Sequence, residues 1–224
     1  MQREIAALVN GWRSDEALPA RNIHLYWNDD AVVACAGMGA HRASLAVEAA
    51  LALGPAAELI SVGWAGACNE RFQVGDVLHP TIVIDAKTGE RFFVKEPGTG
   101  PPPEILITVG APAGAIEKQR LGISYYASAV DMEAAAVARI ARARELPFSA
   151  IKAISDDADF EIPDMQKFAT ASGQFRETAF GLHVAVHPSL WSPVATLAKG
   201  SKLAAERLHA EIEAHIQQHR ERAQ

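Results

Sequence analysis

Residues 129–159 read AVDMEAAAVARIARARELPFSAIKAISDDAD, and this stretch predicts a helix that leads into a buried strand. Apolar side chains recur at helical spacing and form a stripe made of Met132, Ala136, Ile140 and Ala143. Pro147 cannot continue a helix, so we expect the helix to end near Leu146. Residues 148–154 are mostly apolar, which is typical of a strand covered on both faces. The stretch therefore predicts an α/β fold.

Acidic residues stand at both ends of this helix–strand unit. Glu133 opens the helix, and Asp156, Asp157 and Asp159 follow the strand. Ligands of open α/β sheets bind outside the carboxyl ends of the strands, which is where Asp156 is expected. Two structural interpretations stay open: Glu133 as a partner of the helix dipole, and Asp156 as the cap of a following turn.

The segments VDMEAAAVA and KAISDDAD resemble the signature of the nucleoside phosphorylase and methylthioadenosine/S-adenosylhomocysteine nucleosidase superfamily. The resemblance implies that Glu133 holds the ribose hydroxyls, with Met132 under the sugar. It also implies that Asp156, with Ser155 beside it, protonates the leaving purine. The implied fold is one α/β domain over residues 1–224, in three layers, with a central twisted mixed sheet flanked by helices.

Composition excludes several other classes of protein. The chain has 224 residues, of which 49% are hydrophobic, so a sizeable core is possible. Its formal net charge of -6 argues against nucleic acid as a partner. The sequence has neither a long apolar run typical of a membrane span nor a signal-peptide pattern at its start. Cys35 and Cys68 show no framework or metal spacing, which favours the cytoplasm.

The amino-terminal residues MQREIAALV resemble the part of the family that follows its first strand. The resemblance puts Glu4 at the family's water-activating position; the alternative is an acid favoured by the helix dipole. On this alignment the first strand is missing before Met1. Either the true start lies upstream, or the sheet closes without that strand.

A glycine pair joins a predicted strand, residues 31–36, to a predicted helix, residues 40–53. Such a junction lets backbone N–H groups approach an anion or a sugar, so Gly37 and Gly39 are candidate binding residues; a tight turn is the alternative. Arg42 follows and is the candidate phosphate ligand if the protein is a phosphorylase. Its other interpretation is a solvated arginine at a helix start.

A second strand, residues 58–63, is expected to end in the turn Gly63-Trp64-Ala65-Gly66. This turn resembles the family's Gly-Ser-Ala-Gly turn, which implies that Ala65 and Gly66 contact the nucleoside. Trp64 replaces a hydroxyl residue there. It either reshapes the sugar pocket for a bulkier 5' substituent or points into the core.

Residues 110–114, GAPAG, occupy the family's purine-binding loop but lack the aromatic residue that relatives often carry. Tyr125 and Tyr126 lie nearby in sequence as possible substitutes. Phe160, after the acidic cluster, is a candidate cap over the base, and Phe168 is another for which core packing is favoured.

The end of the chain is expected to form helices over residues 164–186, 188–197 and 202–222. The segment from residue 187 onward resembles the tail of hopanoid-associated phosphorylases. His215 and His219 are four residues apart, and His209 is about one turn away. No acidic or cysteine partner completes a metal site in this pattern, so we expect a solvated helix face and no metal.

The resemblance implies cleavage of the N-glycosidic bond of a 5'-substituted adenine nucleoside, with Asp156 as acid, Glu133 as ribose clamp and Glu4 as base for water. Asp157 or Asp159 is expected to keep Asp156 protonated by like-charge repulsion. Hydrolysis is favoured. The alternatives are a phosphate-dependent phosphorylase, for example one acting on adenosylhopane, and a nucleoside-binding relative without turnover. No cofactor is expected beyond phosphate as co-substrate, and the expected assembly is a homodimer or larger.

Overall fold

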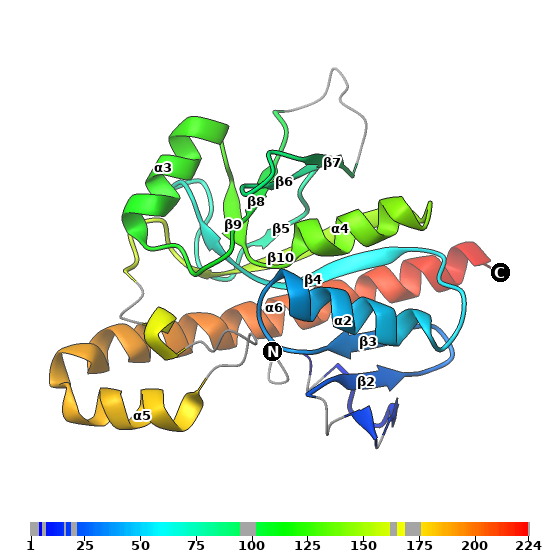
Figure 1. The fold of residues 1–224 in the computed structure, drawn as a ribbon, viewed down its shortest axis with the longest axis horizontal. Helices are drawn as coiled ribbons and strands as arrows, with labels where there is room; N and C mark the ends of the chain where they lie inside the picture. The colour runs from blue at the N-terminus through cyan, green and yellow to red at the C-terminus, as the bar shows by residue number, and fades with distance from the viewer. Residues whose placement is uncertain are drawn as a thin grey trace.

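The computed structural model describes residues 5, 8–15, 17–18, 22–94, 102–161, 165–168 and 176–223, and they form two sheets (Figure 1). The smaller sheet is antiparallel and has the order β1-β2-β3, with bounds Arg13–Ser14, His24–Trp27 and Val32–Cys35. The larger sheet is mixed, with the order β5-β10-β4-β9-β8-β6-β7. Its strands, in that order, are Val77–Leu78, Phe148–Asp156, Leu59–Ala67, Ala129–Asp131, Ile105–Thr108, Ile82–Asp85 and Arg91–Phe93.

Helices cover both faces of the larger sheet. α2 (Ala40–Leu51) and α4 (Ala134–Ala143) contact one another, and α4 packs on β4 and β10. The long helix α6 (Trp191–Ala223) packs against β10, β4 and β5 and runs beneath the sheet in Figure 1. The remaining helical segments are α3 (Ala115–Tyr125), α5 (Glu177–Val186) and the short 3₁₀ turns η2 (Met165–Phe168) and η3 (Pro188–Leu190). The expected layered α/β fold is confirmed.

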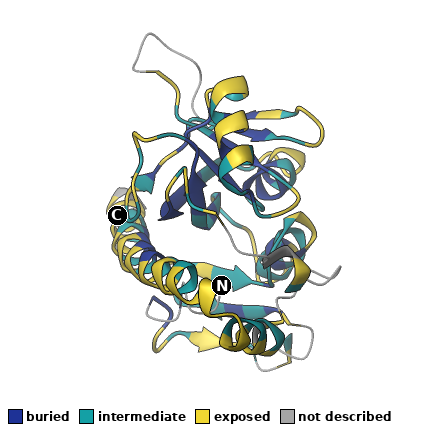
Figure 2. Cartoon of the chain, turned by 90° about the vertical axis from the view of Figure 1, so that its left-hand side faces the viewer, coloured by how far each residue is buried: buried dark blue, intermediate teal, exposed yellow. Residues whose placement is uncertain are grey.

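The predicted helix–strand unit forms the centre of the core. Every residue of α4 from Ala134 to Ala138 is buried, and β10 runs parallel to β4 with Phe148 opposite Leu59. Dark blue, buried segments gather in this region of Figure 2, whereas α3 and α6 turn exposed faces outward. Among the described residues, no helix combines the length and apolar character that a membrane crossing requires.

Two element predictions were wrong, and one helix was missed. Residues 64–66 continue β4 instead of turning, because β10 pairs with that strand as far as Gly66. The helix α3 was not predicted, and Tyr125 and Tyr126 stand at its end. The two tail helices are one 33-residue helix, α6; its Pro193 lies in the first turn, where a missing N–H costs little.

The two sheets are not joined by a ladder among the described residues. β3 pairs only with β2. β4 pairs with β10 along one side, but on its other side it pairs with β9 only at Gly66 and Ala67. On that second side, the described residues place no strand beside Leu59 to Ala65. A cavity of about 1540 Å³ lies along these edges. An apolar cluster nevertheless connects the sheets, because side chains of β2, β3, β4, β10 and α6 meet in it.

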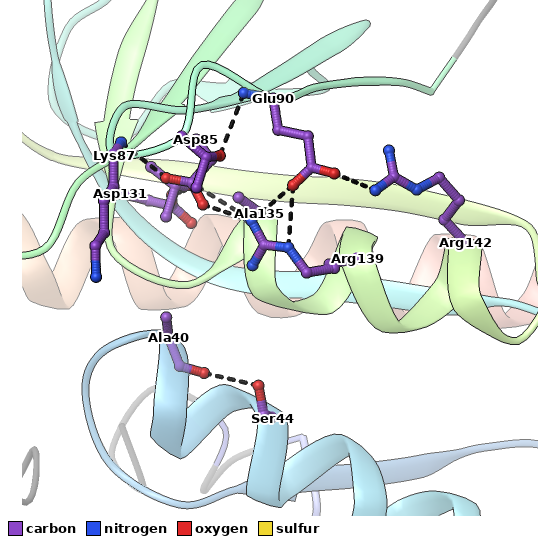
Figure 3. A network of polar contacts seen from close by, with 11 residues as sticks. Ala40, Ser44, Asp85, Lys87, Glu90, Asp131, Ala135, Arg139 and Arg142 are labelled. Carbon is purple, nitrogen blue, oxygen red and sulfur yellow. Dashed lines mark hydrogen bonds and ion pairs between the residues drawn. The ribbon is translucent and has the colours of Figure 1, made fainter.

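Ion pairs fasten α4 to the β6–β7 hairpin (Figure 3). Arg139 reaches Asp85 at 2.6 Å and Glu90 at 2.9 Å, and Arg142 also contacts Glu90. Burial alone would raise the pKa of Asp85, but the hydrogen bonds and charge of Arg139, with the N–H of Lys87, outweigh burial and lower it. The pKa of Glu90 is lowered by Arg142 and Arg139. Both acids are therefore held as carboxylates at neutral pH.

Candidate active site

Residues from the two signature segments line one cavity. Glu133 and Met132 at the start of α4 and Ser155 and Asp156 at the end of β10 all lie on its wall. The wall also includes four further predicted residues, Gly37, Trp64, Ala65 and Gly66. Its volume exceeds the roughly 300–1,000 Å³ of ordinary ligand pockets, so a small-molecule ligand would fill part of it.

The glycine loop before α2 holds Glu133. The Gly39 N–H donates to Glu133 Oε1 at 2.7 Å, and the Met132 N–H donates to Oε2 at 3.3 Å. Gly37 and Gly39 have φ angles of 115° and 90°, which favour glycine, and this conformation brings the loop to the acid. A carboxylate has about four lone-pair sites, so its two oxygens can accept several hydrogen bonds at once.

A buried polar group under Glu133 fixes the start of α4. Asp131 accepts hydrogen bonds from the Thr108 hydroxyl at 2.6 Å and from the Ala134 N–H at 2.9 Å. The ammonium of Lys152 lies 2.9 Å from the same carboxylate, and both side chains are almost fully buried. Asp131 thus ties the first N–H of α4 to Thr108 and Lys152, directly beside Glu133.

A buried lysine contacts Asp156. The Lys118 ammonium, on α3, contacts Asp156 Oδ2, and the Ser155 hydroxyl donates to Oδ1 at 2.6 Å. Lys118 also donates to the backbone oxygens of Asp157 at 2.7 Å and Phe160 at 3.3 Å. The Asp156 side chain is 7% exposed and that of Lys118 only 1%, so the pair is sheltered from solvent at the cavity wall.

The other acids of the cluster turn away from Asp156. Asp157 is exposed and accepts a hydrogen bond from the Val74 N–H at 3.1 Å, and Asp159 is also exposed. The charged group in contact with Asp156 is the cation of Lys118, and the role of Asp157 or Asp159 in keeping Asp156 protonated stays a prediction. At the end of β10, the chain carries Asp157 out to solvent.

Gly66 gives this ion pair its space. A Cβ at residue 66 would lie 2.8 Å from Asp156 Oδ2 and 2.9 Å from Lys118 Cε, so any larger residue displaces the pair. Ala65 is buried on the face of β4 that meets α4. Trp64, the residue before Ala65, lines the cavity with part of its surface and packs into the apolar cluster beside α6. Successive side chains of a strand point to opposite faces, so Ala65 faces α4 whereas Trp64 faces the cluster beside α6. This favours the interpretation that Trp64 points into the core.

The predicted base-binding residues fall into two groups. Pro112 and Ala113 of the GAPAG loop line the cavity beside Lys118. Phe160 is not on the wall; its ring centre lies 5.9 Å from the Lys118 ammonium. Tyr126 is 83% exposed and Tyr125 packs in a separate apolar cluster, so neither substitutes for the missing aromatic residue.

The predicted nucleophile-side residues are not brought to this wall by the described part of the structure. Arg42 is buried, and its guanidinium donates to the backbone oxygens of Ala36 and, at 2.6 Å, of Asn22. It is not among the residues that line the cavity. Glu4 lies outside the described residues. The phosphate role of Arg42 and the water-activating role of Glu4 stay predictions.

Sequence reasoning missed Lys118, Asp131 and Lys152. The burial of Lys118 could have been suspected from its spacing. It lies three residues before Leu121, which is fully buried, and both residues are on the inner face of α3. Asp131 also had a sequence signal, since it precedes a helix start by the spacing of a capping residue. Lys152 lies in the middle of a buried strand, where a lysine needs a partner.

Comparison with known proteins identifies the fold. A candidate methylthioadenosine nucleosidase from Weissella paramesenteroides has a TM-score of 0.64 at 18% identity, over 96% of each chain. Futalosine hydrolase of Helicobacter pylori has a TM-score of 0.63 at 16% identity, over 96% of this chain and 94% of that one. The 5'-methylthioadenosine/S-adenosylhomocysteine nucleosidase of Neisseria meningitidis, in complex with methylthio-immucillin-A, has a TM-score of 0.62 at 19% identity, over 94% and 95%. No curated protein sequence matches this chain.

The sequence pattern of a family matches the chain directly. The phosphorylase superfamily matches residues 21–118 and 113–182, which include the glycine loop, both signature segments and Lys118. These two matches span well over half of the 224 residues. The chain therefore belongs to the phosphorylase superfamily.

Proposed function

We propose that this protein cleaves the N-glycosidic bond of a 5'-substituted adenine nucleoside and releases adenine. Its family is the phosphorylase superfamily, and two solved structures that share its fold are described as nucleosidases. The observation that carries the proposal is the placement of Glu133 and Asp156 on the wall of one cavity. One acid is held by a glycine loop and the other by a buried cation, so the two differ in environment as their roles require.

The chemistry assigns each group a step. As the bond between C1' and the purine breaks, its electron pair goes to the base and positive charge develops on the ribose. Glu133 orients the ribose hydroxyls and stabilises that charge electrostatically. The purine takes a proton from the group formed by Asp156, Lys118 and Ser155, and solvent returns it. Water adds to C1' and gives up a proton, which balances the reaction.

Hydrolysis is favoured over phosphorolysis. A phosphorylase needs cationic or N–H groups to hold phosphate, and Arg42 is not among the residues that line the cavity; its guanidinium donates to the backbone oxygens of Ala36 and Asn22. The cavity has room for a 5' substituent beyond the ribose. The Neisseria enzyme is described with a methylthio-substituted analogue, which supports methylthioadenosine as a first substrate to test. We further propose a cytoplasmic homodimer that needs no cofactor.

The test is release of free base from methylthioadenosine, adenosylhomocysteine, inosine and adenosylhopane, each with and without phosphate. Adenine release independent of phosphate is expected from the first two. If a sugar phosphate formed only when phosphate was added, the reaction would be phosphorolysis and not hydrolysis. Tight binding with no free base would identify a relative without turnover.

The role of Asp156 as part of the proton-donating group is tested with a variant. Asp156→Asn, shown to be folded by circular dichroism, is expected to slow turnover by about 10²–10⁴-fold, because the proton donor is lost. Glu117→Gln is the matched control: this acid lies on α3 one residue before Lys118 but pairs with Arg120 on the exposed side. Wild-type turnover by the folded Asp156→Asn variant would refute the assignment.

A further inference from the structure

Two histidines lie side by side near the end of α6. His215 and His219 are one helical turn apart, and their ring centres are 4.6 Å from one another with 37° between the planes. Residues at this spacing share one face of a helix, and two histidines so placed are a recurrent pair of metal ligands. The sequence alone indicated this pair but no acidic partner.

Glu58 is that partner, and it comes from a distant part of the chain. It directly precedes β4, and its Oε2 lies 3.5 Å from His215 Nε2 and 3.4 Å from His219 Nε2. The potential ligand atoms of the three residues all lie within 4.8 Å of one another. Within the described ranges, this is the one group of three or more such side chains. The structure thus supplies the acidic partner that the sequence pattern lacked.

The distances fit a tetrahedral ion. Zinc binds histidine nitrogen and carboxylate oxygen at about 2.0–2.2 Å, so two ligands at a tetrahedral angle are about 3.4 Å apart. Both nitrogen–oxygen distances to Glu58 match that separation. A direct hydrogen bond, by contrast, needs about 2.7–3.2 Å. The spacing is thus wider than a hydrogen-bonded pair needs and suits an ion between the atoms.

The surroundings favour binding. Glu58 and His215 have side chains 17% and 24% exposed, and His215 Nε2 is buried without a hydrogen bond. His219 is 47% exposed, which leaves a way in for an ion. The nearest basic residue in sequence, Arg220, lies 3.8 Å from Asp30, whose carboxylate offsets its charge.

We propose that Glu58, His215 and His219 bind a divalent transition-metal ion of the zinc type. Imidazole and carboxylate suit zinc, cobalt and nickel, and three protein ligands leave a fourth position for water. The ion would join the end of α6 to the start of β4. All three ligands line the cavity that contains Glu133. Glu58 directly precedes the first residue of β4, whereas Asp156 pairs with Gly66 near the other end of that strand, so the ion would stabilise the cavity wall and take no part in bond cleavage.

The experiment titrates untagged, metal-free protein with Zn²⁺ by calorimetry and records its melting temperature with and without the ion. One bound ion per chain and a higher melting temperature, reversed by a chelator, are expected. Glu58→Gln, His215→Gln and His219→Gln are each expected to weaken binding by at least about 10-fold. The visible spectrum of bound Co²⁺ should show the intense bands of a four-coordinate ion.

The matched control is His209→Gln. His209 lies on the same helix but pairs with Glu213 at 3.3 Å, outside the group, so this variant should bind zinc as the wild type does. Circular dichroism without metal separates loss of binding from loss of fold. Equal affinity in all four variants, equal loss in all four, or a six-coordinate cobalt spectrum would overturn the proposal.

Discussion

At the scale of single residues, the most consequential group is the buried pair of Lys118 and Asp156. Both side chains are at most 7% exposed, and the lysine also satisfies two backbone oxygens. Charges taken out of water need a partner, so removing one leaves the other uncompensated. The pair thus links the stability of the fold to the shape of the candidate site.

A double-mutant cycle measures this link. Lys118→Met is expected to lower the free energy of unfolding by about 3–5 kcal/mol, because it leaves a buried carboxylate alone. The double variant Lys118→Met/Asp156→Asn should recover much of that loss, since both charges are gone. Urea denaturation gives the values, with Lys199→Met as a control at an exposed lysine of α6. Simple addition of the two single losses would contradict the coupling.

The two cysteines are predicted to differ in reactivity. Burial raises the pKa of Cys68 to about 12, more than the nearby Lys118 lowers it, so very little thiolate forms at pH 8. Cys35 is half-buried. Iodoacetamide at pH 8 should therefore modify Cys35 in the native protein and both residues in urea, as read by mass spectrometry. Rapid native modification of Cys68 would show that its surroundings open.

The sequence revealed the acids of the site but not the groups that hold them. Glu133 and Asp156 could be predicted because each stands at the end of an element in a short, recognisable segment. Lys118 could not be paired with Asp156, because they come from elements 38 residues apart and the loops between them fix the contact. The orientation of Asp157 toward Val74 depends on the same long-range packing.

At the scale of elements, α4 is held by its apolar face and by charges at its outer edge. Arg139 connects the helix to Asp85 at the end of β6, and Asp85 is the more sheltered partner, with 13% of its side chain exposed against 40% for Arg139. The folded state lowers the pKa of Asp85, so its contribution to stability is present at neutral pH and is lost as pH falls through the folded pKa.

Asp85→Asn tests this contribution. At pH 7 the variant should be less stable by at most about 1 kcal/mol, because solvent screens the half-exposed arginine. The difference should shrink as the pH is lowered below the ordinary pKa of aspartate, since the wild type then loses the same charge. Urea denaturation at a series of pH values measures it. A difference that stays constant down to low pH would mean that the ion pair is not its cause.

Elements were predictable where side-chain pattern and burial agree. α4 and β10 follow the rule, with apolar positions inside. In α3 the pattern is inverted, since Ile116 and Ile123 are 80% and 71% exposed whereas Lys118 is buried, and the helix was missed. The end of β4 was assigned to a turn because it resembles the family's Gly-Ser-Ala-Gly turn, but pairing with β10 keeps it extended.

At the scale of the whole molecule, α6 connects the two sheets, between which the described residues form no ladder. Its Ala204, Leu208 and Ile212 meet side chains of the small sheet, such as Tyr26 and Val33, in one apolar cluster with side chains of the large sheet. Its Gly200 passes so close to the end of β10 that a Cβ would lie 2.5 Å from the Ser155 oxygen. The helix thus connects both sheets to the candidate site.

This arrangement predicts that both sheets unfold together. Trp27 reports on the small sheet and Trp64 on the large one, so single-tryptophan variants of each should show coincident urea transitions. Leu208→Ala should lower the free energy of unfolding by about 2–5 kcal/mol in both reports, because a fully buried leucine leaves a cavity between the sheets. Leu203→Ala, at a residue of the same helix that is 39% exposed, should cost less than about 1 kcal/mol. In Leu208→Ala, a shift of the Trp27 transition alone to lower urea concentration would mean that the small sheet unfolds as a separate unit. The cavity wall formed by the Gly37 loop would then open before the rest of the site.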